Sequence, residues 1–406
     1  MTTSPPLRVL FVAFSRSSLG HVTRMRTAAA RFADAGHDVA VACHEDVRPL
    51  VERAGLPWIG VDEIGPAPKW RGMDDVEQLR AFVRTRLASP AYLEACLRDE
   101  LRAIDDFAPD VVVSDMRNTA SVAASMRGLP SFTCHNLRLF RHPMHVVLPE
   151  VLAALSALGI ESAHARNVLG DAVLVPDVAL LDPLSEVPEQ TAALMSSLVG
   201  EIRHVGPLAP AELLRRTVRA DREPELNITL GGSGAGDADL LRVAAAARDL
   251  GVRLTVTLGV EGAGVADLAA RVREAAGSAQ LDVAGFRHDT VDVMARSAAA
   301  VVHGGHSSLV EGLLCATPLV LVPHSGEQRG NAERVQALGL GQVVTPADGP
   351  AELAEAIRRA LFESDRAAHT SFADAMRSAD GAAEMLAVVE RAAALAAARQ
   401  HAQVSA

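Results

Sequence analysis

The sequence predicts an α/β protein made of two successive doubly wound domains. Three observations lead to this class. The chain has 406 residues, more than a single hydrophobic core normally serves. Its expected strands are short, continuous apolar runs, which are typical of parallel strands covered by helices on both faces. The strand, loop and helix order of the first half begins again after residues 206–224, where glycine, prolines and arginines interrupt the pattern.

In the first half, apolar runs alternate with helical patterns. A strand is expected at Arg8–Phe14, followed by a Ser/Gly turn and a helix over His21–Ala35 that closes at Gly36. Further strands are expected at Asp38–Ala42 and Asp110–Ser114, and one or two long helices between Met73 and Phe107. Prolines and short apolar runs in residues 135–184 leave the elements there undefined.

The second half repeats this order. Strands are expected at Leu226–Leu230, Arg253–Leu258, Ala299–Val302 and Leu319–Val322, and Asp237 is placed to cap the helix after the glycine loop 231–236. The predicted domains are residues 1–205 and 225–380, joined by a linker at 206–224. An alanine-rich helix in residues 381–406 is expected to pack back on the first domain.

Composition restricts the class of partner. The hydrophobic share of 49% and charged share of 22% are those of an ordinary globular protein. A net charge of -11 disfavours binding to nucleic acid or to anionic lipid. The apolar run near Leu10 is too short for a secretory signal, and no segment is long enough for a membrane span. Four scattered cysteines favour reduced thiols over zinc ligands, so we expect a cytoplasmic protein.

The strongest motif begins where an expected strand ends, with His303-Gly-Gly-His-Ser-Ser-Leu-Val-Glu311. Its glycines let a ligand approach the backbone, and Ser307 and Ser308 open a helix whose N–H groups and dipole favour a phosphate. Glu311 stands one turn into that helix, where a carboxylate can accept hydrogen bonds from two ribose hydroxyls. The alternative is an ordinary βα turn in which Glu311 only complements the helix dipole.

The spacing of this motif resembles the nucleotide-sugar signature of family 1 glycosyltransferases of the bacterial natural-product type. The residues that fall in register are His303, Gly305, Ser308, Glu311, Pro323, Gln328, Asn331 and Ala332. The resemblance implies the GT-B fold, in which two Rossmann-like domains face each other across a deep cleft and the C-terminal domain holds a UDP- or dTDP-sugar. Glu327 departs from the commoner Asp, and Cys315-Ala-Thr-Pro318 departs from the usual Gly-x-Pro turn.

By this resemblance, specific residues would bind the donor. His303 and Ser308 would contact the diphosphate, Glu311 the ribose, and Glu327 with Gln328 the sugar. Gly285-Phe-Arg-His288 occupies the register of the box that flanks the base. The donor residues implied in this way are Arg287, His288, His303, Gly305, Ser307, Ser308, Glu311, Glu327 and Gln328. The helix that opens near Ser307 would replace a metal, so neither metal nor other cofactor is expected.

A second constellation places His21 at the first βα turn and Asp115 after another strand. A histidine there can act as general base for a hydroxyl, and a buried carboxylate can orient its ring. Alternatively, His21 only begins a helix and Asp115 caps one. The family's His-Asp dyad sits at these two turns, so the resemblance implies catalysis. The form Gly-His-x-x-Arg24 is more similar to the peptidoglycan N-acetylglucosaminyltransferase branch. That branch also favours a loop like Gly231–Ala235, in which Ser233 and Gly234 are further phosphate candidates.

A basic and aromatic cluster, His135 to His145, is a candidate lining for the acceptor site, and a solvated surface turn is the alternative. The acceptor candidates are Trp70, His135, Arg138 and His142.

The combined reading is an inverting glycosyltransferase that moves a sugar from a UDP- or dTDP-sugar to a hydroxyl of a small natural-product acceptor. His21 would be the general base and Asp115 its support. Two alternatives stay open, a sugar-nucleotide epimerase on the same fold and a catalytically silent GT-B helper protein. The sequence leaves a homodimer open.

Overall fold

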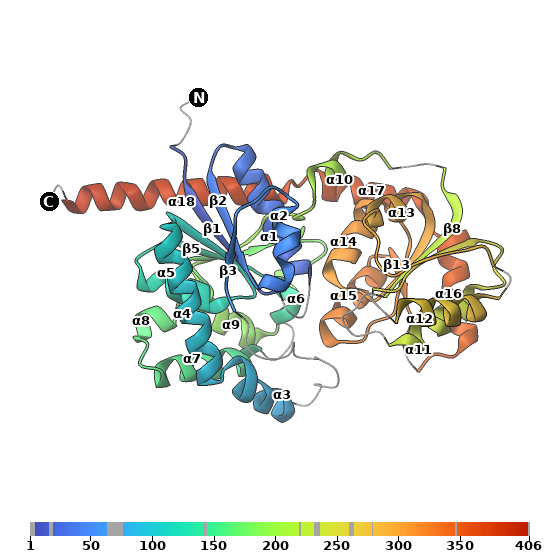
Figure 1. Cartoon of the computed structure of the whole chain (residues 1–406), viewed down its shortest axis with the longest axis horizontal. Helices are drawn as coiled ribbons and strands as arrows, with labels where there is room; N and C mark the ends of the chain where they lie inside the picture. The colour runs from blue at the N-terminus through green and yellow to red at the C-terminus, as the bar shows by residue number, and fades with distance from the viewer. Residues whose placement is uncertain are drawn as a thin grey trace. The chain divides into compact units, whose positions relative to one another are not determined.

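The computed structural model describes residues 5–15, 19–62, 76–140, 144–218, 221–230, 236–259, 264–277, 279–345 and 347–404 (Figure 1). These residues form two compact units. Unit 1 contains the described residues up to 208 together with 379–404, and unit 2 contains those from 209 to 378. The C-terminal segment therefore returns to the unit in which the chain begins.

Unit 1 is built on a seven-stranded parallel sheet with the order β3-β2-β1-β4-β5-β6-β7. The predicted strands are confirmed as β1, β2 and β4, and four shorter strands complete the sheet. Their bounds are β1 Arg8–Ala13, β2 Asp38–Cys43, β3 Trp58–Gly60, β4 Val111–Asp115, β5 Ser131–Cys134, β6 Ala172–Val175 and β7 Glu201–His204.

Alternate residues of β1 point into two different cores. Val9 and Phe11 pack against α1 and the C-terminal helix α18, whereas Leu10 and Val12 pack with the helices of the other face. All four side chains are essentially inaccessible, so β1 has no polar face, as a central parallel strand requires.

The helices of unit 1 are α1 Leu19–Asp34, η1 Glu45–Val47, α2 Arg48–Glu52, α3 Val76–Phe82, η2 Val83–Leu87, α4 Pro90–Phe107, α5 Asn118–Met126, α6 Leu137–Phe140, α7 Met144–Ala157, α8 Ser162–Ala165, η3 Leu184–Glu186, α9 Glu189–Leu198 and α18 Gly381–Val404.

Unit 2 repeats the architecture with six parallel strands in the order β10-β9-β8-β11-β12-β13. Its strands are β8 Glu223–Thr229, β9 Arg253–Thr257, β10 Leu281–Ala284, β11 Ser297–Val302, β12 Leu319–Leu321 and β13 Gly341–Val343. The helices are α10 Ala211–Arg215, α11 Asp237–Ala247, α12 Val265–Ala276, α13 Thr290–Arg296, α14 His306–Leu314, α15 Gly326–Ala337, α16 Pro350–Phe362 and α17 Arg366–Arg377. The four strands predicted in this half are confirmed as β8, β9, β11 and β12. The prediction of two doubly wound sheets is therefore confirmed.

Some local predictions need correction. Asp237 is the first residue of α11, not its cap; the cap is Gly236, whose N–H donates to Asp239. Asp237 instead pairs with Arg271 at 2.8 Å, because its side chain faces the neighbouring helix α12. Asp115 is likewise no helix cap, since it is the last residue of β4.

The far end of α14 is held by arginines of unit 2. Arg222 donates to the carbonyl groups of Cys315 and Ala316, and Arg377 donates to that of Leu314. These are carbonyls at the negative end of the helix, where a cation is stabilising. The position of α14, and with it the turn that precedes the helix, is thus fixed from its C-terminal end.

Candidate active site

Both sheets reverse their strand order at one point, between β1 and β4 in unit 1 and between β8 and β11 in unit 2. In open α/β sheets, ligands bind beyond the carboxyl ends of the strands at such a point. His21 follows β1 and Asp115 ends β4, while His303 follows β11. Each predicted constellation therefore lies at the switch point of its own sheet.

His21 and Asp115 are in direct contact. The His21 Nδ1 atom lies 2.8 Å from Asp115 Oδ1, and the two side chains are 16% and 0% exposed. The parallel register brings the end of β1 beside the end of β4, with Ala13 opposite Asp115. When the ring hydrogen is on Nδ1, the carboxylate accepts it and the Nε2 lone pair is left for another proton.

Arg24, which has no role predicted from the sequence, lies in the same cluster. Its Nε donates to Asp115 Oδ2 at 2.7 Å and its Nη2 to Asp115 Oδ1 at 2.9 Å, a bidentate pair. A signal was available in the sequence. His21 and Arg24 are three positions apart, which places them on one face of α1.

The electrostatics of this cluster favour an ionised carboxylate. Burial alone would raise the pKa of Asp115, but Arg24 and His21 outweigh this effect and hold the pKa well below its usual range. Burial lowers the pKa of the neighbouring His135 to about 4, and the charge of Arg24 lowers it further. His135 is therefore neutral at physiological pH.

The acceptor candidates His135 and Arg138 lie in the interior of unit 1. His135 Nε2 is 3.1 Å from Asn118 Oδ1. Arg138 is fully buried, and its guanidinium donates to Asp177 Oδ2 and to the carbonyl of Leu181, both at 2.6 Å. The sequence placed Arg138 either at a polar acceptor group or on the surface. Its charge is compensated within unit 1, and its bonds join α6 to the loop after β6.

In unit 2, the turn after β11 is shaped for close approach. Gly304 has φ +83°, a conformation that favours glycine. A Cβ added at Gly305 would collide with the His303 ring at Nε2. Helix α14 begins directly after this turn, and Ser308 Oγ donates to the Gly305 carbonyl at 3.2 Å. Ser307 lies with it in the first turn, so the serines belong to the helix opening as predicted.

Two buried titratable groups flank this turn. Burial lowers the pKa of His303 to about 4, against an opposing effect from Glu327. A neutral imidazole can still donate one N–H to a phosphate. Burial raises the pKa of Glu311 to about 7, and no hydrogen bond holds its carboxylate within the described part of the chain. Glu311 is thus an unengaged acceptor on α14.

The loop after β12 is tied to the same turn. Asn331 Nδ2 donates to the Gly304 carbonyl at 2.7 Å, and Gln328 Oε1 accepts from the His324 N–H at 2.8 Å. Ser325 caps α15 by accepting from the Gln328 N–H, so Glu327 lies in the first turn of that helix. These bonds bring the candidates His303, Glu327 and Gln328 into one region of unit 2.

The candidates after β10 are arranged differently. Arg287 pairs with Asp289 at 2.9 Å and with Asp282 at 2.8 Å, so its charge is compensated. His288 lies edge-on to Phe286, with ring centroids 5.2 Å apart. Phe286 is 44% exposed, which makes it the aromatic surface available at this position.

Four candidates lie outside the described residues, namely Trp70, His142, Ser233 and Gly234. Among the residues that the structure does describe, no cluster of three or more His, Cys, Asp or Glu side chains is arranged to hold a metal ion. No helix in this part of the chain is both long and apolar enough to cross a membrane.

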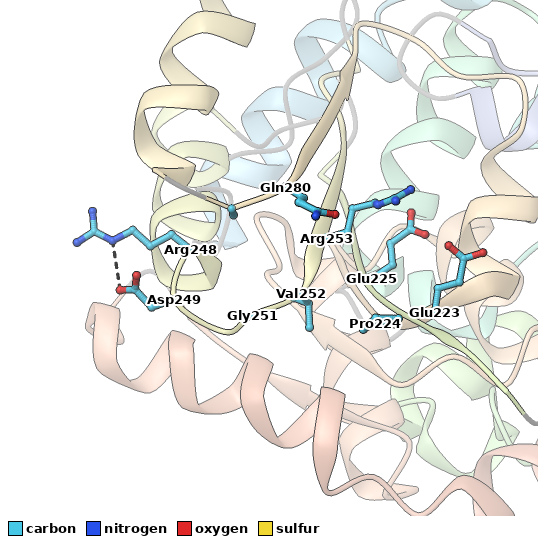
Figure 2. Close-up of a pocket in the computed structure, with 10 residues that line it drawn as sticks. Glu223, Pro224, Glu225, Arg248, Asp249, Gly251, Val252, Arg253 and Gln280 are labelled. Carbon is cyan, nitrogen blue, oxygen red and sulfur yellow. Dashed lines mark hydrogen bonds and ion pairs between the residues drawn. The ribbon is translucent and has the colours of Figure 1, made fainter.

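Unit 2 also contains a cavity of about 640 Å³ at the amino ends of β8 and β9 (Figure 2). Glu225 and Arg253 lie on one side of it, and Arg248 with Asp249 on the other. Glu225 is already bound by Arg296 and Thr255. The cavity lies at the opposite end of the strands from His303, so we do not assign the donor to it.

Comparisons with known proteins agree with the two-sheet architecture. Residues 249–385 match the family model described as glycosyltransferase family 28 C-terminal domain. An uncharacterized glycosyltransferase of Methanopyrus kandleri is 30% identical over 278 residues, which cover 67% of this chain and 74% of the relative. An uncharacterized glycosyltransferase of Methanosarcina mazei is 25% identical over 349 residues, covering 84% and 87%.

The fold has a solved counterpart in CalG4, the calicheamicin glycosyltransferase. That structure is similar with a TM-score of 0.69 at 20% identity, and the match covers 95% of this chain and 98% of CalG4. Likeness at this identity shows the fold, and the relative from Methanopyrus kandleri shows the family. The chain therefore belongs to the glycosyltransferases and is a transferase of the GT-B fold.

Proposed function

We propose that this glycosyltransferase moves a sugar from a UDP- or dTDP-sugar to a hydroxyl of a small-molecule acceptor with inversion at the anomeric carbon. His21 Nε2 takes the hydroxyl proton, the acceptor oxygen forms the new bond to the anomeric carbon, and the bond to the nucleoside diphosphate breaks. The leaving diphosphate carries away the electron pair of the broken bond, and the proton is left on His21.

The observation that carries this proposal is the 2.8 Å contact between His21 Nδ1 and Asp115 Oδ1. A general base needs an unprotonated nitrogen that faces its substrate and a partner that orients the ring. Asp115 supplies the partner, and its buried negative charge stabilises the imidazolium that forms during transfer. The 16% exposure of the His21 side chain leaves the ring accessible to a hydroxyl.

The donor would bind to unit 2. The first turn of α14 and the neutral His303 supply N–H groups for the diphosphate, and the unengaged carboxylate of Glu311 can accept from ribose hydroxyls. Glu327 and Gln328 would meet the sugar, and Phe286 offers a face to the base. Because this set can stabilise the diphosphate charge, we expect transfer to continue in the presence of EDTA.

Thermal unfolding with UDP, dTDP and GDP tests the donor assignment. A ligand that binds only the native state stabilises it by RT ln(1 + [L]/Kd), about 2.7 kcal/mol at a hundredfold excess over Kd. We expect a rise of several degrees with UDP or dTDP and a smaller one with GDP. If none of the three nucleotides shifts the transition, the donor assignment is wrong.

Product analysis separates transfer from the two alternatives. An epimerase would convert the nucleotide sugar without an acceptor, and a silent helper protein would bind it unchanged. Release of nucleoside diphosphate that depends on a hydroxylated acceptor is the result that we expect.

A further inference from the structure

We propose that Arg24 is a positioning residue that holds Asp115 and His21 in the arrangement of a neutral base. In this assignment Arg24 keeps the Nδ1 hydrogen of His21 directed at Asp115. It also opposes protonation of Nε2 before the acceptor binds. The inference rests on the proposed role of His21 and extends the His-Asp pair to a cluster of three.

Arg24 contacts both members of the pair. Besides the two bonds to Asp115, its Nη2 atom lies 2.9 Å from His21 Nδ1. The guanidinium nitrogen Nη2 can only donate hydrogen bonds. The carboxylate of Asp115 is a stronger acceptor for its hydrogens than the ring nitrogen of His21. Asp115 Oδ1 also lies 2.8 Å from His21 Nδ1. A hydrogen on Nδ1 therefore avoids facing two lone pairs toward each other, and both Nδ1 and Arg24 Nη2 then donate to Asp115 Oδ1.

The balance of charge shows what Arg24 contributes. In a pair of Asp115 and His21 alone, protonating the ring would turn a buried lone anion into a neutral ion pair, which favours the imidazolium. With Arg24 present, Asp115 is already neutralised while His21 is uncharged. Protonating His21 then adds a net positive charge beside a guanidinium. Without Arg24, the cluster is neutral when His21 is protonated; with Arg24, it is neutral when His21 is uncharged.

The other groups that face His21 do not undo this balance. Within the described residues, β4 contributes Asp115 and the loop after β5 contributes His135, which is neutral at physiological pH. The end of β1 contributes the ring of Phe14, edge-on at 6.1 Å between centroids. The charge balance around His21 is thus set by the carboxylate of Asp115 and the guanidinium of Arg24.

Arg24 is also prevented from swinging away. Its Nη1 donates to Asn136 Oδ1 at 2.8 Å, and Asn136 Nδ2 donates to Asp177 Oδ2 at 3.1 Å. Arg138 donates to the same Asp177 oxygen. The chain of bonds joins α1 to the loops after β5 and β6, and Arg24 is 4% exposed. A guanidinium fixed in this way is suited to hold other side chains, since little of it is accessible to an acceptor.

The test compares Arg24→Gln with Arg24→Lys and with Arg26→Gln. Glutamine removes the positive charge but keeps an amide N–H donor. Lysine keeps the charge but loses the planar guanidinium that binds both oxygens of Asp115. Arg26 is the matched control, because it is an arginine of the same helix that bonds to the Leu50 carbonyl. In each folded protein, 15N NMR of the histidine rings reports the tautomer and titration midpoint of His21, identified by its absence in His21→Ala. The pH profile of acceptor-dependent nucleotide release is measured in parallel.

In the wild type, we expect His21 to carry its hydrogen on Nδ1. In Arg24→Gln, we expect the His21 titration midpoint and the acid limb of kcat/KM to move to higher pH by about one unit. In Arg24→Lys the midpoint should stay close to that of the wild type while kcat falls, and Arg26→Gln should change neither. UDP or dTDP should stabilise all three variants as it stabilises the wild type.

A hydrogen on Nε2 in the wild type, or a uniform loss of rate at every pH in Arg24→Gln with an unmoved midpoint, would overturn the inference. If Arg24→Gln does not fold, Arg24→Lys decides, and an acid limb displaced upward by about one unit despite the retained charge would contradict the proposal. Failure of the proposed function gives a different result, since His21→Ala would then keep full turnover whatever Arg24 does.

Discussion

His21 and Asp115, 94 positions apart in the chain, meet with 2.8 Å between Nδ1 and Oδ1. Their meeting follows from the order of the sheet, because β1 and β4 are neighbours and both side chains stand at the carboxyl edge. The pair that we propose as catalytic is formed by residues of a helix and a strand, α1 and β4.

The first prediction concerns the buried carboxylate. Asp115→Asn should abolish turnover and lower the free energy of unfolding by about 3 kcal/mol or more, because it removes the buried carboxylate that pairs with the charge of Arg24. The matched control is Asp105→Asn, which breaks an exposed pair with Arg127 at 2.7 Å. That change should cost less than about 1 kcal/mol. Urea denaturation of both variants measures the difference, and equal losses would contradict the account.

A second prediction uses the turn before α14. A methyl group at Gly305 would collide with the His303 ring, so Gly305→Ala should displace His303 and weaken nucleotide binding at least tenfold. Gly330→Ala, where the added group meets nothing within 4 Å, should leave the affinity unchanged. Isothermal titration with UDP or dTDP checks both variants. Unaltered affinity in Gly305→Ala would remove His303 from the donor site.

The third prediction concerns pH. Burial raises the pKa of Glu311 from 4.5 to about 7, so the folded protein holds this proton more tightly than the unfolded chain. The wild type should lose stability relative to Glu311→Gln as the pH rises from about 4.5 to 7, and the difference should level off above that range. Its size should be on the order of 2 kcal/mol. Urea denaturation of both proteins at pH 5 and pH 8 measures this difference, and equal values at the two pH values would contradict it.

Much of the fold could be predicted from the sequence. Continuous apolar runs such as Arg8–Phe14 and Ala299–Val302 identify central strands, because a strand buried on both faces has few polar residues. The edge strands β3 and β13 have three half-buried residues each, too few for any periodicity to appear. They form because the backbone of a neighbouring strand pairs with them, and a local sequence pattern does not show this pairing.

The candidate site could be predicted in part. The positions of His303, Glu311 and His21 follow from strand ends and helix starts, which are local features. The bond from Arg24 to Asn136 joins residues 112 positions apart, and the compensation of Arg138 depends on Asp177 in another loop. Such pairings are decided by sheet order and packing. A charged residue in a polar segment therefore suggested either an acceptor contact or a surface turn, while the structure places Arg138 in the interior.

Turnover by His21→Ala tests the proposed mechanism most directly. The wild type and the variant are given the UDP- or dTDP-sugar whose nucleotide raises thermal stability most, with a panel of small hydroxylated acceptors, and glycosylated product is counted by mass spectrometry. The account predicts loss of product by at least a hundredfold, with the nucleotide-induced rise in thermal stability unchanged. Undiminished product formation by His21→Ala would contradict it.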